Sequence, residues 1–313
     1  MKTRAMFLQR LTPEAVGQKL AVFAGSGFGG YSRSRLDIGK VVGYGLQVGS
    51  VIRCHPTLPR AMDHARDLIV RESAAGRSFA SGTVIIAETM TKSKGRFTRS
   101  WHAPPGGLWG CMVHANTLLP QSRHFIPMAV GVACCEAVGE LGCEPAAIRW
   151  VNDVLIEGRK VAGFLVEGYT EPGFKEEFNL VGFGINVNNS SFPPDLSGTA
   201  GSVSDYLGRE VDLTDFGVSF LARLAWNIGL LYHEEERELA GKPFSGRGGI
   251  HALLARWLEL SDTIGQDVIY GFDVVTNPQY PARVVGVDDS GGLILELEDG
   301  HRKTEYSGEV RYR

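Results

Sequence analysis

The spacing of apolar residues from residue 51 onward predicts short strands alternating with amphipathic helices. Apolar runs predict strands over 51–54, 83–87, 108–113, 154–156, 161–166 and 180–187. Pro59 and Pro127 stand where helices would begin, because proline fits the first helical turn. A longer helix would follow, with Thr214 as its N-cap. This mixed order predicts an α+β fold with a mixed, largely antiparallel sheet and helices.

The last part of the chain changes to an all-β pattern. Leu293, Leu295 and Leu297 alternate with other residues, as in a strand with one buried face. Gly-rich turns at short intervals are typical of a small barrel. We therefore predict a barrel over 263–313, a larger unit over 51–260, and an N-terminal extension of unknown role over 1–50.

Residues 1–50 have the weakest pattern. Their apolar run 20–23 would form a strand, and Gly25, Gly27 and Gly30 after it match the G-x-G-x-x-G spacing of dinucleotide-binding loops. That motif needs a helix directly after it, and the residues after Gly30 are a poor helix start. A family-specific loop is the favoured interpretation. Because no two-helix pattern is visible, we expect no helix-turn-helix domain and no DNA binding.

Composition narrows the class of protein. The 313 residues include 40 glycines without a three-residue period, which excludes collagen, and the hydrophobic share of 43% is enough for a large core. The formal net charge of -3 means that an anion site must be a local cluster. No apolar run approaches the roughly 18 residues of a membrane span. Five cysteines without metal-ligand spacing predict a reduced, cytoplasmic protein.

Cations and glycines gather after the second predicted strand. Residues 91–101 carry four cations, Lys92, Lys94, Arg96 and Arg99, among Gly, Ser and Thr. Such a loop suits a polyphosphate or an acyl-phosphate transition state, and a solvated basic loop is the alternative. The pair 106–107 then enters a strand, where glycine backbone lets a ligand approach closely or simply makes a tight turn.

Two further stretches point to a ligand. Asn152 and Asp153 lie beside buried residues and need partners, which a ligand or a hairpin turn would supply. Lys160 starts an apolar strand, where its charge is costly unless it faces a cleft or an anion. Gly182 and Gly184 alternate with apolar residues, so one strand face is bare and a neighbouring strand or a planar ligand must lie close to it.

Taken in order, these stretches resemble the catalytic domain of biotin protein ligases. The matching segments are Met90–Trp101, Ala103–Leu108, Arg149–Asp153, Gly158–Glu167 and Gly182–Asn188. Residues 291–293 and 307–310 resemble the SH3-like C-terminal domain of the same family. Across residues 51–313 the resemblance implies a class II synthetase-like catalytic domain. It also implies an ATP-dependent ligase that forms biotinyl-AMP and transfers biotin to a carrier-protein lysine.

The resemblance assigns roles to matching positions. Arg96 and Lys160 would be catalytic. The residues expected to bind ATP or the adenylate are Lys94, Gly95, Arg96, Arg99, Trp101, Arg149, Asn152, Asp153 and Asn186. Those expected to bind biotin are Gly106, Gly107, Lys160 and Gly163. ATP and Mg²⁺ would be the cofactors, with Asp153 as the Mg²⁺ ligand. A biotin carboxyl carrier domain and a homodimer partner are the expected partners, without a membrane.

The chain departs from the family pattern where the biotin ring should bind. Arg60-Ala61-Met62 stands in place of S-T-N and Met90 in place of Gln, so the usual hydrogen-bonding set for the ureido ring is missing. Lys94 and Arg149 keep their charge on the phosphate side. Two alternatives therefore stay open. One is a ligase of the same fold that activates a lipoate-like or octanoate-like acid. The other is a non-catalytic homologue that binds an acyl-adenylate or a carrier domain.

Overall fold

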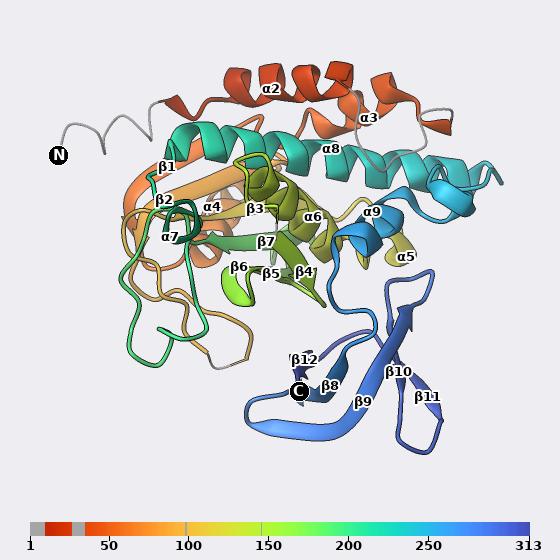
Figure 1. Ribbon diagram of the computed structural model, residues 1–313. Helices are drawn as coiled ribbons and strands as arrows, with labels where there is room; N and C mark the ends of the chain where they lie inside the picture. Colours follow the sequence, from red (N-terminus) through yellow and green to blue (C-terminus); the bar gives the residue numbers. More distant parts are fainter. Residues whose placement is uncertain (1–9, 27–34, 98, 145) are drawn as a thin grey trace.

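The main body is built on a seven-stranded sheet (Figure 1). The computed structural model describes residues 10–26, 35–97, 99–144 and 146–313. The strands, in spatial order, are β1 (Ile52–Leu58), β2 (Thr83–Met90), β3 (Leu108–Ala115), β7 (Glu177–Ile185), β6 (Arg159–Thr170), β5 (Asp153–Ile156) and β4 (Ala146–Arg149). Only β1 and β2 run parallel, and the other neighbours pair antiparallel. The predicted α+β class and largely antiparallel sheet are confirmed.

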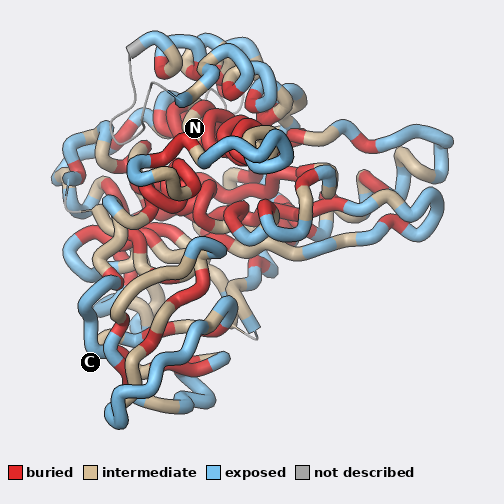
Figure 2. The backbone as a smooth tube through the Cα atoms, turned by 90° about the vertical axis from the view of Figure 1, so that its right-hand side faces the viewer, coloured by how far each residue is buried: buried red, intermediate tan, exposed pale blue. Residues whose placement is uncertain are grey.

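Helices cover both faces of this sheet. On one face α4 (Ala61–Ala74) buries Met62 and Ile69 against alternate strand residues such as Ile85. The opposite set of strand residues, such as Ile86, faces α6 (Ile126–Gly139) and α8 (Leu213–Leu239). Figure 2 shows the buried positions concentrated between these layers. The remaining short helices are α5 (Pro120–Arg123), α7 (Val203–Leu207), η2 (Arg247–Gly249) and α9 (Ala252–Leu260). The N-cap of α8 is Asp212, which accepts from two backbone N–H groups, and not Thr214 as predicted.

The N-terminal region corrects two predictions. Where a strand was expected over 20–23, the structure has α2 (Pro13–Ser26), and α3 (Ile38–Gly45) follows it. The helical signal is the spacing of buried Val16, Leu20 and Phe23 at i, i+4 and i+7. Both helices pack along α8 (Figure 1), so a two-helix pattern is present after all. Gly27 and Gly30 of the G-x-G-x-x-G spacing lie outside the described residues.

Glycines allow α3 and α8 to approach closely. A Cβ atom at Gly229 would lie 2.0 Å from the carbonyl oxygen of Val41. A Cβ atom at Gly45 would lie 2.3 Å from the carbonyl oxygen of Ala225. A Cβ atom cannot lie this close to a backbone oxygen, so only glycine fits at either position. Two of the 40 glycines therefore allow the close crossing of α3 and α8.

The C-terminal region forms a second, five-stranded sheet, which confirms the predicted small all-β domain. Its strands, in spatial order, are β11 (Arg302–Glu305), β10 (Leu293–Glu296), β9 (Asn277–Val287), β8 (Asp267–Asp273) and β12 (Glu309–Tyr312). Leu293 and Leu295 are buried, as their alternation predicts. The domain limits at residues 50 and 260 stay a prediction.

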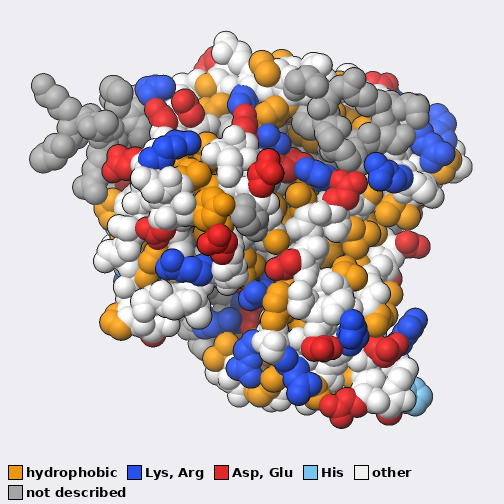
Figure 3. All heavy atoms as spheres, viewed as in Figure 1, with side chains coloured by type: hydrophobic (Ala, Val, Ile, Leu, Met, Phe, Trp, Pro, Cys, Tyr) orange, Lys and Arg blue, Asp and Glu red, His pale blue; other side chains and the backbone are white. Residues whose placement is uncertain are grey.

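The surface carries both signs of charge. Figure 3 shows acidic and basic side chains interspersed on the face that it presents, in keeping with the net charge of -3. Among the described residues, no helix has the length and apolar character that a membrane crossing needs.

Candidate active site

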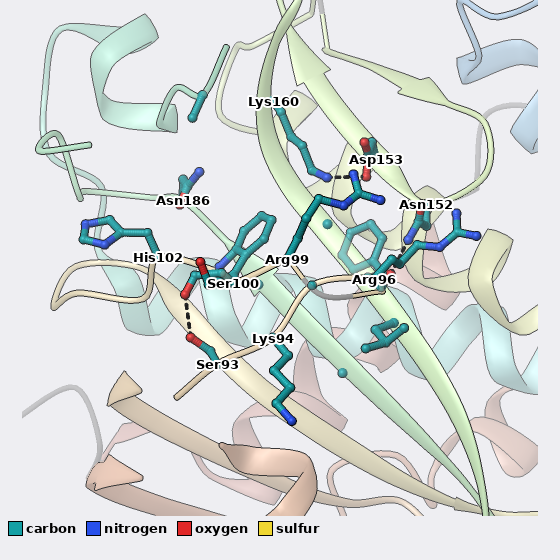
Figure 4. A pocket seen from close by; sticks show the side chains of 18 of the residues that line it. Ser93, Lys94, Arg96, Arg99, Ser100, His102, Asn152, Asp153, Lys160 and Asn186 are labelled. Atoms are coloured by element: carbon teal, nitrogen blue, oxygen red, sulfur yellow. Dashed lines mark hydrogen bonds and ion pairs between the residues drawn. The ribbon is translucent and has the colours of Figure 1, made fainter. Parts of the chain in front are cut away.

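A cavity of about 470 Å³ lies on the α4 side of the sheet, between the loop 91–101 and the C-terminal domain. It collects eleven of the residues expected at the site: Lys94, Gly95, Arg96, Arg99, Trp101, Arg149, Asn152, Asp153, Lys160, Gly163 and Asn186. Figure 4 shows that they come from the loop and from neighbouring strands. Segments far apart in sequence thus converge on one cavity.

The loop 91–101 is held by its own backbone. The Gly95 N–H donates to the Arg99 carbonyl at 2.8 Å, and the Trp101 N–H donates to the Ser93 carbonyl at 3.1 Å. The Ser93 hydroxyl donates back to the Trp101 carbonyl at 2.6 Å. These bonds leave the cationic side chains Arg96 and Arg99 to project into the cavity.

Trp101 covers the bare glycine face predicted from the sequence. A Cβ atom at Gly184 would lie 2.6 Å from its Nε1, and a Cβ atom at Gly163 would lie 3.0 Å from its ring. The close neighbour is therefore a side chain of the protein itself. The Lys160 ammonium lies 5.4 Å from the centroid of the same ring, a cation–π distance.

Lys160 and Asp153 face each other inside the cavity. Lys160 Nζ lies 2.7 Å from Asp153 Oδ1 (Figure 4). Beside them, the Asn152 amide donates to the Phe164 carbonyl, which fixes the turn between β4 and β5. An ammonium in this position can receive a substrate carboxylate, because both its partner and the indole leave it partly exposed.

The C-terminal domain closes one side of the cavity and contacts the loop 91–101. Arg96 Nη1 donates to the Gly308 carbonyl at 2.7 Å, and Arg99 forms an ion pair with Glu309. Burial lowers the pKa of Arg96, and the nearby Glu309 carboxylate opposes that effect. Arg149 stacks on the ring of Tyr312 at 4.0 Å, and its buried Nε has no hydrogen-bond partner in the described structure.

Three predicted residues are held by protein neighbours. Asn186 is buried, and its Oδ1 accepts from Asn189 at 3.0 Å. Gly106 and Gly107 do not line the cavity in the described structure. A Cβ atom on Gly106 would lie 3.1 Å from Asn188, and one on Gly107 would lie 2.0 Å from the Trp109 ring. Their role in biotin binding stays a prediction.

Sequence reasoning missed the charged residues at the far end of the cavity. Arg60 is buried, lines the cavity and pairs with Glu167 at 2.7 Å. Met62 and Met90 lie beside it. In the sequence, Arg60 stands at the start of a helix where the family has serine. That comparison shows the loss of a hydroxyl group but not the new role of the cation. Glu309, which lies beside Arg99, belongs to the C-terminal motif 307–310, but the sequence does not show that Arg99 is its partner.

Family comparisons match both domains. A family model described as Biotin/lipoate A/B protein ligase family matches residues 67–186, and one described as Biotin protein ligase C terminal domain matches residues 265–311. The chain is 26% identical over 239 residues to the Bifunctional ligase/repressor BirA of Bacillus subtilis, covering 75% of this chain and 68% of that protein. It is 29% identical over 240 residues to the Biotin--[acetyl-CoA-carboxylase] ligase of Mycobacterium tuberculosis, covering 74% and 79%.

A solved structure has the same fold. The biotin protein ligase from Aquifex aeolicus in complex with biotin and ATP aligns with a TM-score of 0.64 and 22% identity, covering 84% of this chain and 98% of that chain. The two family models lie, in this order, within the cavity-bearing body and within the small all-β domain. The chain therefore belongs to the biotin protein ligase family and is an enzyme of the ligase class.

Proposed function

We propose that this protein uses ATP to activate biotin as biotinyl-AMP and then transfers biotin to a lysine of a carboxyl carrier domain. The observation that carries the proposal is the grouping of Lys160, Arg96 and Arg99 in one cavity, above a floor of glycine backbone. Three cations that line one cavity match a carboxylate that reacts with a phosphate.

The first step joins two anions, and the cations offset their repulsion. A carboxylate oxygen of biotin attacks the α-phosphorus of ATP, and the bond from that phosphorus to pyrophosphate breaks. Lys160 would hold the carboxylate, while Arg96 and Arg99 would neutralise charge that develops on the phosphate oxygens. Arg99 would exchange its present partner, the Glu309 carboxylate, for a phosphate oxygen, because both are anionic acceptors.

The second step needs little acid–base chemistry from the protein. The amine of the carrier lysine attacks the acyl carbon, and AMP leaves with the bonding electrons. Because the mixed anhydride is already activated, correct positioning accounts for most of the rate. Lys160 would then stabilise the charge on the acyl oxygen.

The residues present fit a magnesium ion that is held mainly by ATP. The described residues contain no group of three or more side chains suited to a metal, but Asp153 lies in the cavity. Mg²⁺ commonly binds one or two carboxylates together with substrate phosphates. Asp153 would hold the ion, which would neutralise phosphate charge. A homodimer and a cytoplasmic location stay predictions.

Pyrophosphate release tests the proposal. The full chain is incubated with MgATP and biotin, lipoate or octanoate, and transfer to a purified carrier domain is followed by mass spectrometry. We expect release with biotin and a mass increase of the carrier that corresponds to one biotinyl group. Release only with lipoate or octanoate would support the alternative acid. Adenylate binding without any release would support a non-catalytic homologue.

A further inference from the structure

One face of β6 connects the two ends of the cavity. Gly163, Leu165 and Glu167 lie at alternate positions and so point to the same side of the sheet. Gly163 lies under Lys160 and Trp101, Leu165 lines the middle, and Glu167 pairs with Arg60. At roughly 3.4 Å per residue, the two ends are about 14 Å apart. An acid that is long enough to span the cavity, with its carboxylate at Lys160, would place its tail at Arg60.

Arg60 is fixed at this far end by its neighbours. Its Nη1 donates to Asp63 at 3.1 Å, and its Nη2 donates to Glu167 at 2.7 Å and to the Met62 sulfur at 3.2 Å. A guanidinium has five N–H groups. Within the described part of the chain, these acceptors leave two of them for a ligand.

The cluster around Arg60 carries no net charge. Arg66 pairs with the same two carboxylates, Asp63 and Glu167, so two cations balance two anions. Arg66 lies six residues further along the chain, in α4, over the ring of Tyr169. Of the two arginines, only Arg60 lines the cavity in the described structure.

The rest of this end is apolar. Met62 packs on Gly182, where a Cβ atom would lie 2.7 Å from its sulfur. The Met90 sulfur accepts from the Ala61 N–H at 3.3 Å. Thioether sulfurs are weak acceptors. This end of the cavity therefore offers good donors, weak acceptors and an apolar wall.

We propose that Arg60 selects the acid by donating a hydrogen bond to a neutral carbonyl oxygen at the end remote from the reacting carboxylate. The inference rests on the proposed function and specifies its substrate class: an acid with an apolar frame and a neutral carbonyl head, such as the cyclic urea of biotin. Arg60 then supplies the donor, and Glu167 keeps its guanidinium in place.

Two other tails fit this end less well. A second carboxylate finds no net positive charge, because Asp63 and Glu167 already balance the arginines. A plain hydrocarbon tail, as in octanoate, leaves buried N–H groups of Arg60 without an acceptor, which costs binding free energy. The weak sulfur acceptors also mean that the two N–H groups of a urea contribute less than its oxygen.

Substrate panels with two variants and one matched control test this assignment. Binding is measured by calorimetry and turnover by pyrophosphate release, for biotin, desthiobiotin (which keeps the cyclic urea), lipoate and octanoate. In Arg60→Met we expect biotin and desthiobiotin to lose about 100-fold in kcat/KM, mostly through KM, with octanoate unchanged or improved. Arg60→Lys keeps the charge but loses the planar fork, and we expect a loss of about 10-fold. Arg71→Met, at an exposed arginine of α4 that does not line the cavity, is the control and should stay within about 3-fold.

The outcomes separate this inference from the proposed function. If Arg60→Met binds and uses biotin as well as the wild type does, or if the wild type prefers octanoate, Arg60 does not select the acid. If the wild type binds biotin in calorimetry but releases no pyrophosphate, the proposed function fails while the assignment of Arg60 is still decided by binding. Thermal unfolding and ATP binding show whether each variant is folded. If Arg60→Met does not fold, Arg60→Lys decides whether Arg60 selects the acid.

Discussion

The ammonium of Lys160 lies 2.7 Å from the carboxylate of Asp153, across the neighbouring strands β6 and β5. Both side chains are partly exposed to the cavity, at 36% and 26% of their area. A pair in this setting is weakly bound and can separate when stronger charges arrive. Under the proposed function, the ammonium would hold the carboxylate of the acid and the Asp153 carboxylate would hold the magnesium ion of the nucleotide.

Lys160→Ala should therefore reduce chemistry more than stability. Removal of one group that neutralises a developing anion typically costs about 100-fold to 1000-fold in kcat. We expect a loss of this size in pyrophosphate release with biotin, and little change in the midpoint of thermal unfolding. Lys92→Ala is the matched control, because Lys92 is an exposed cation of the same loop. Equal activity of the two variants would contradict the role given to Lys160.

The packing of Trp101 on β7 gives a second prediction. Gly184→Ala places a methyl group 2.6 Å from the indole nitrogen, so the ring must move off the floor of the cavity. We expect KM for biotin and ATP to rise by about 10-fold or more, because Trp101 positions the loop beside Lys160.

Gly168→Ala provides the control for this variant. Gly168 lies in the neighbouring strand β6, and a Cβ atom there would meet no atom within 4 Å. Steady-state kinetics of both variants, with circular dichroism to check folding, would measure the effect. A normal KM in Gly184→Ala would show that the position of the indole is unimportant for binding.

The active-site loop and strands could be predicted because their chemistry is local. The cations of residues 91–101, the Asn152–Asp153 turn and Lys160 are each visible as short patterns, and the structure brings them to one cavity. Arg60 and Glu167 could not be paired in this way. They are separated by about a hundred residues, and only the register of β6 and the start of α4 brings them together.

The N-terminal helices were missed for a related reason. Their apolar faces are short and interrupted by glycine, which lowers helix propensity and hides the period. What stabilises them is the tertiary contact with α8, for which Gly45 and Gly229 leave room. A pattern that depends on a partner helix far along the chain cannot be recognised from the local sequence.

That helix crossing supplies a third prediction. Gly229→Ala would place a methyl group 2.0 Å from the Val41 carbonyl, so α3 must shift away from α8. Overpacking of this kind costs about 1–3 kcal/mol of unfolding free energy. Gly43→Ala is the matched control, because a Cβ atom there meets nothing within 4 Å and alanine favours the helix. We expect denaturant unfolding to show a loss for the first variant and no loss for the second. An unchanged midpoint in Gly229→Ala would mean that α3 is only loosely attached.

The buried histidine at the start of α9 gives a pH-dependent prediction. Burial lowers the pKa of His251 from 6.5 to about 4, and its ring stacks on Phe125 at 4.1 Å between centroids. The folded protein therefore keeps His251 neutral in a range where the unfolded chain takes up a proton. Stability from this group is fully present above pH 6.5, is lost as the pH falls from 6.5 to about 4, and changes no further below that. A shift of this size corresponds to about 3 kcal/mol over the window.

His251→Asn isolates this contribution. His251 Nδ1 accepts from the Leu253 N–H at 3.2 Å as the N-cap of α9, and asparagine can supply the same acceptor without titrating in this range. We expect the variant to lose stability at pH 7, because the ring contact with Phe125 is gone, but to depend less on pH between 6.5 and 4.5. His301→Asn, at an exposed turn, should keep the wild-type slope. Urea unfolding at several pH values measures both, and a slope in His251→Asn equal to that of the wild type would show that another group, such as buried His114, dominates the window.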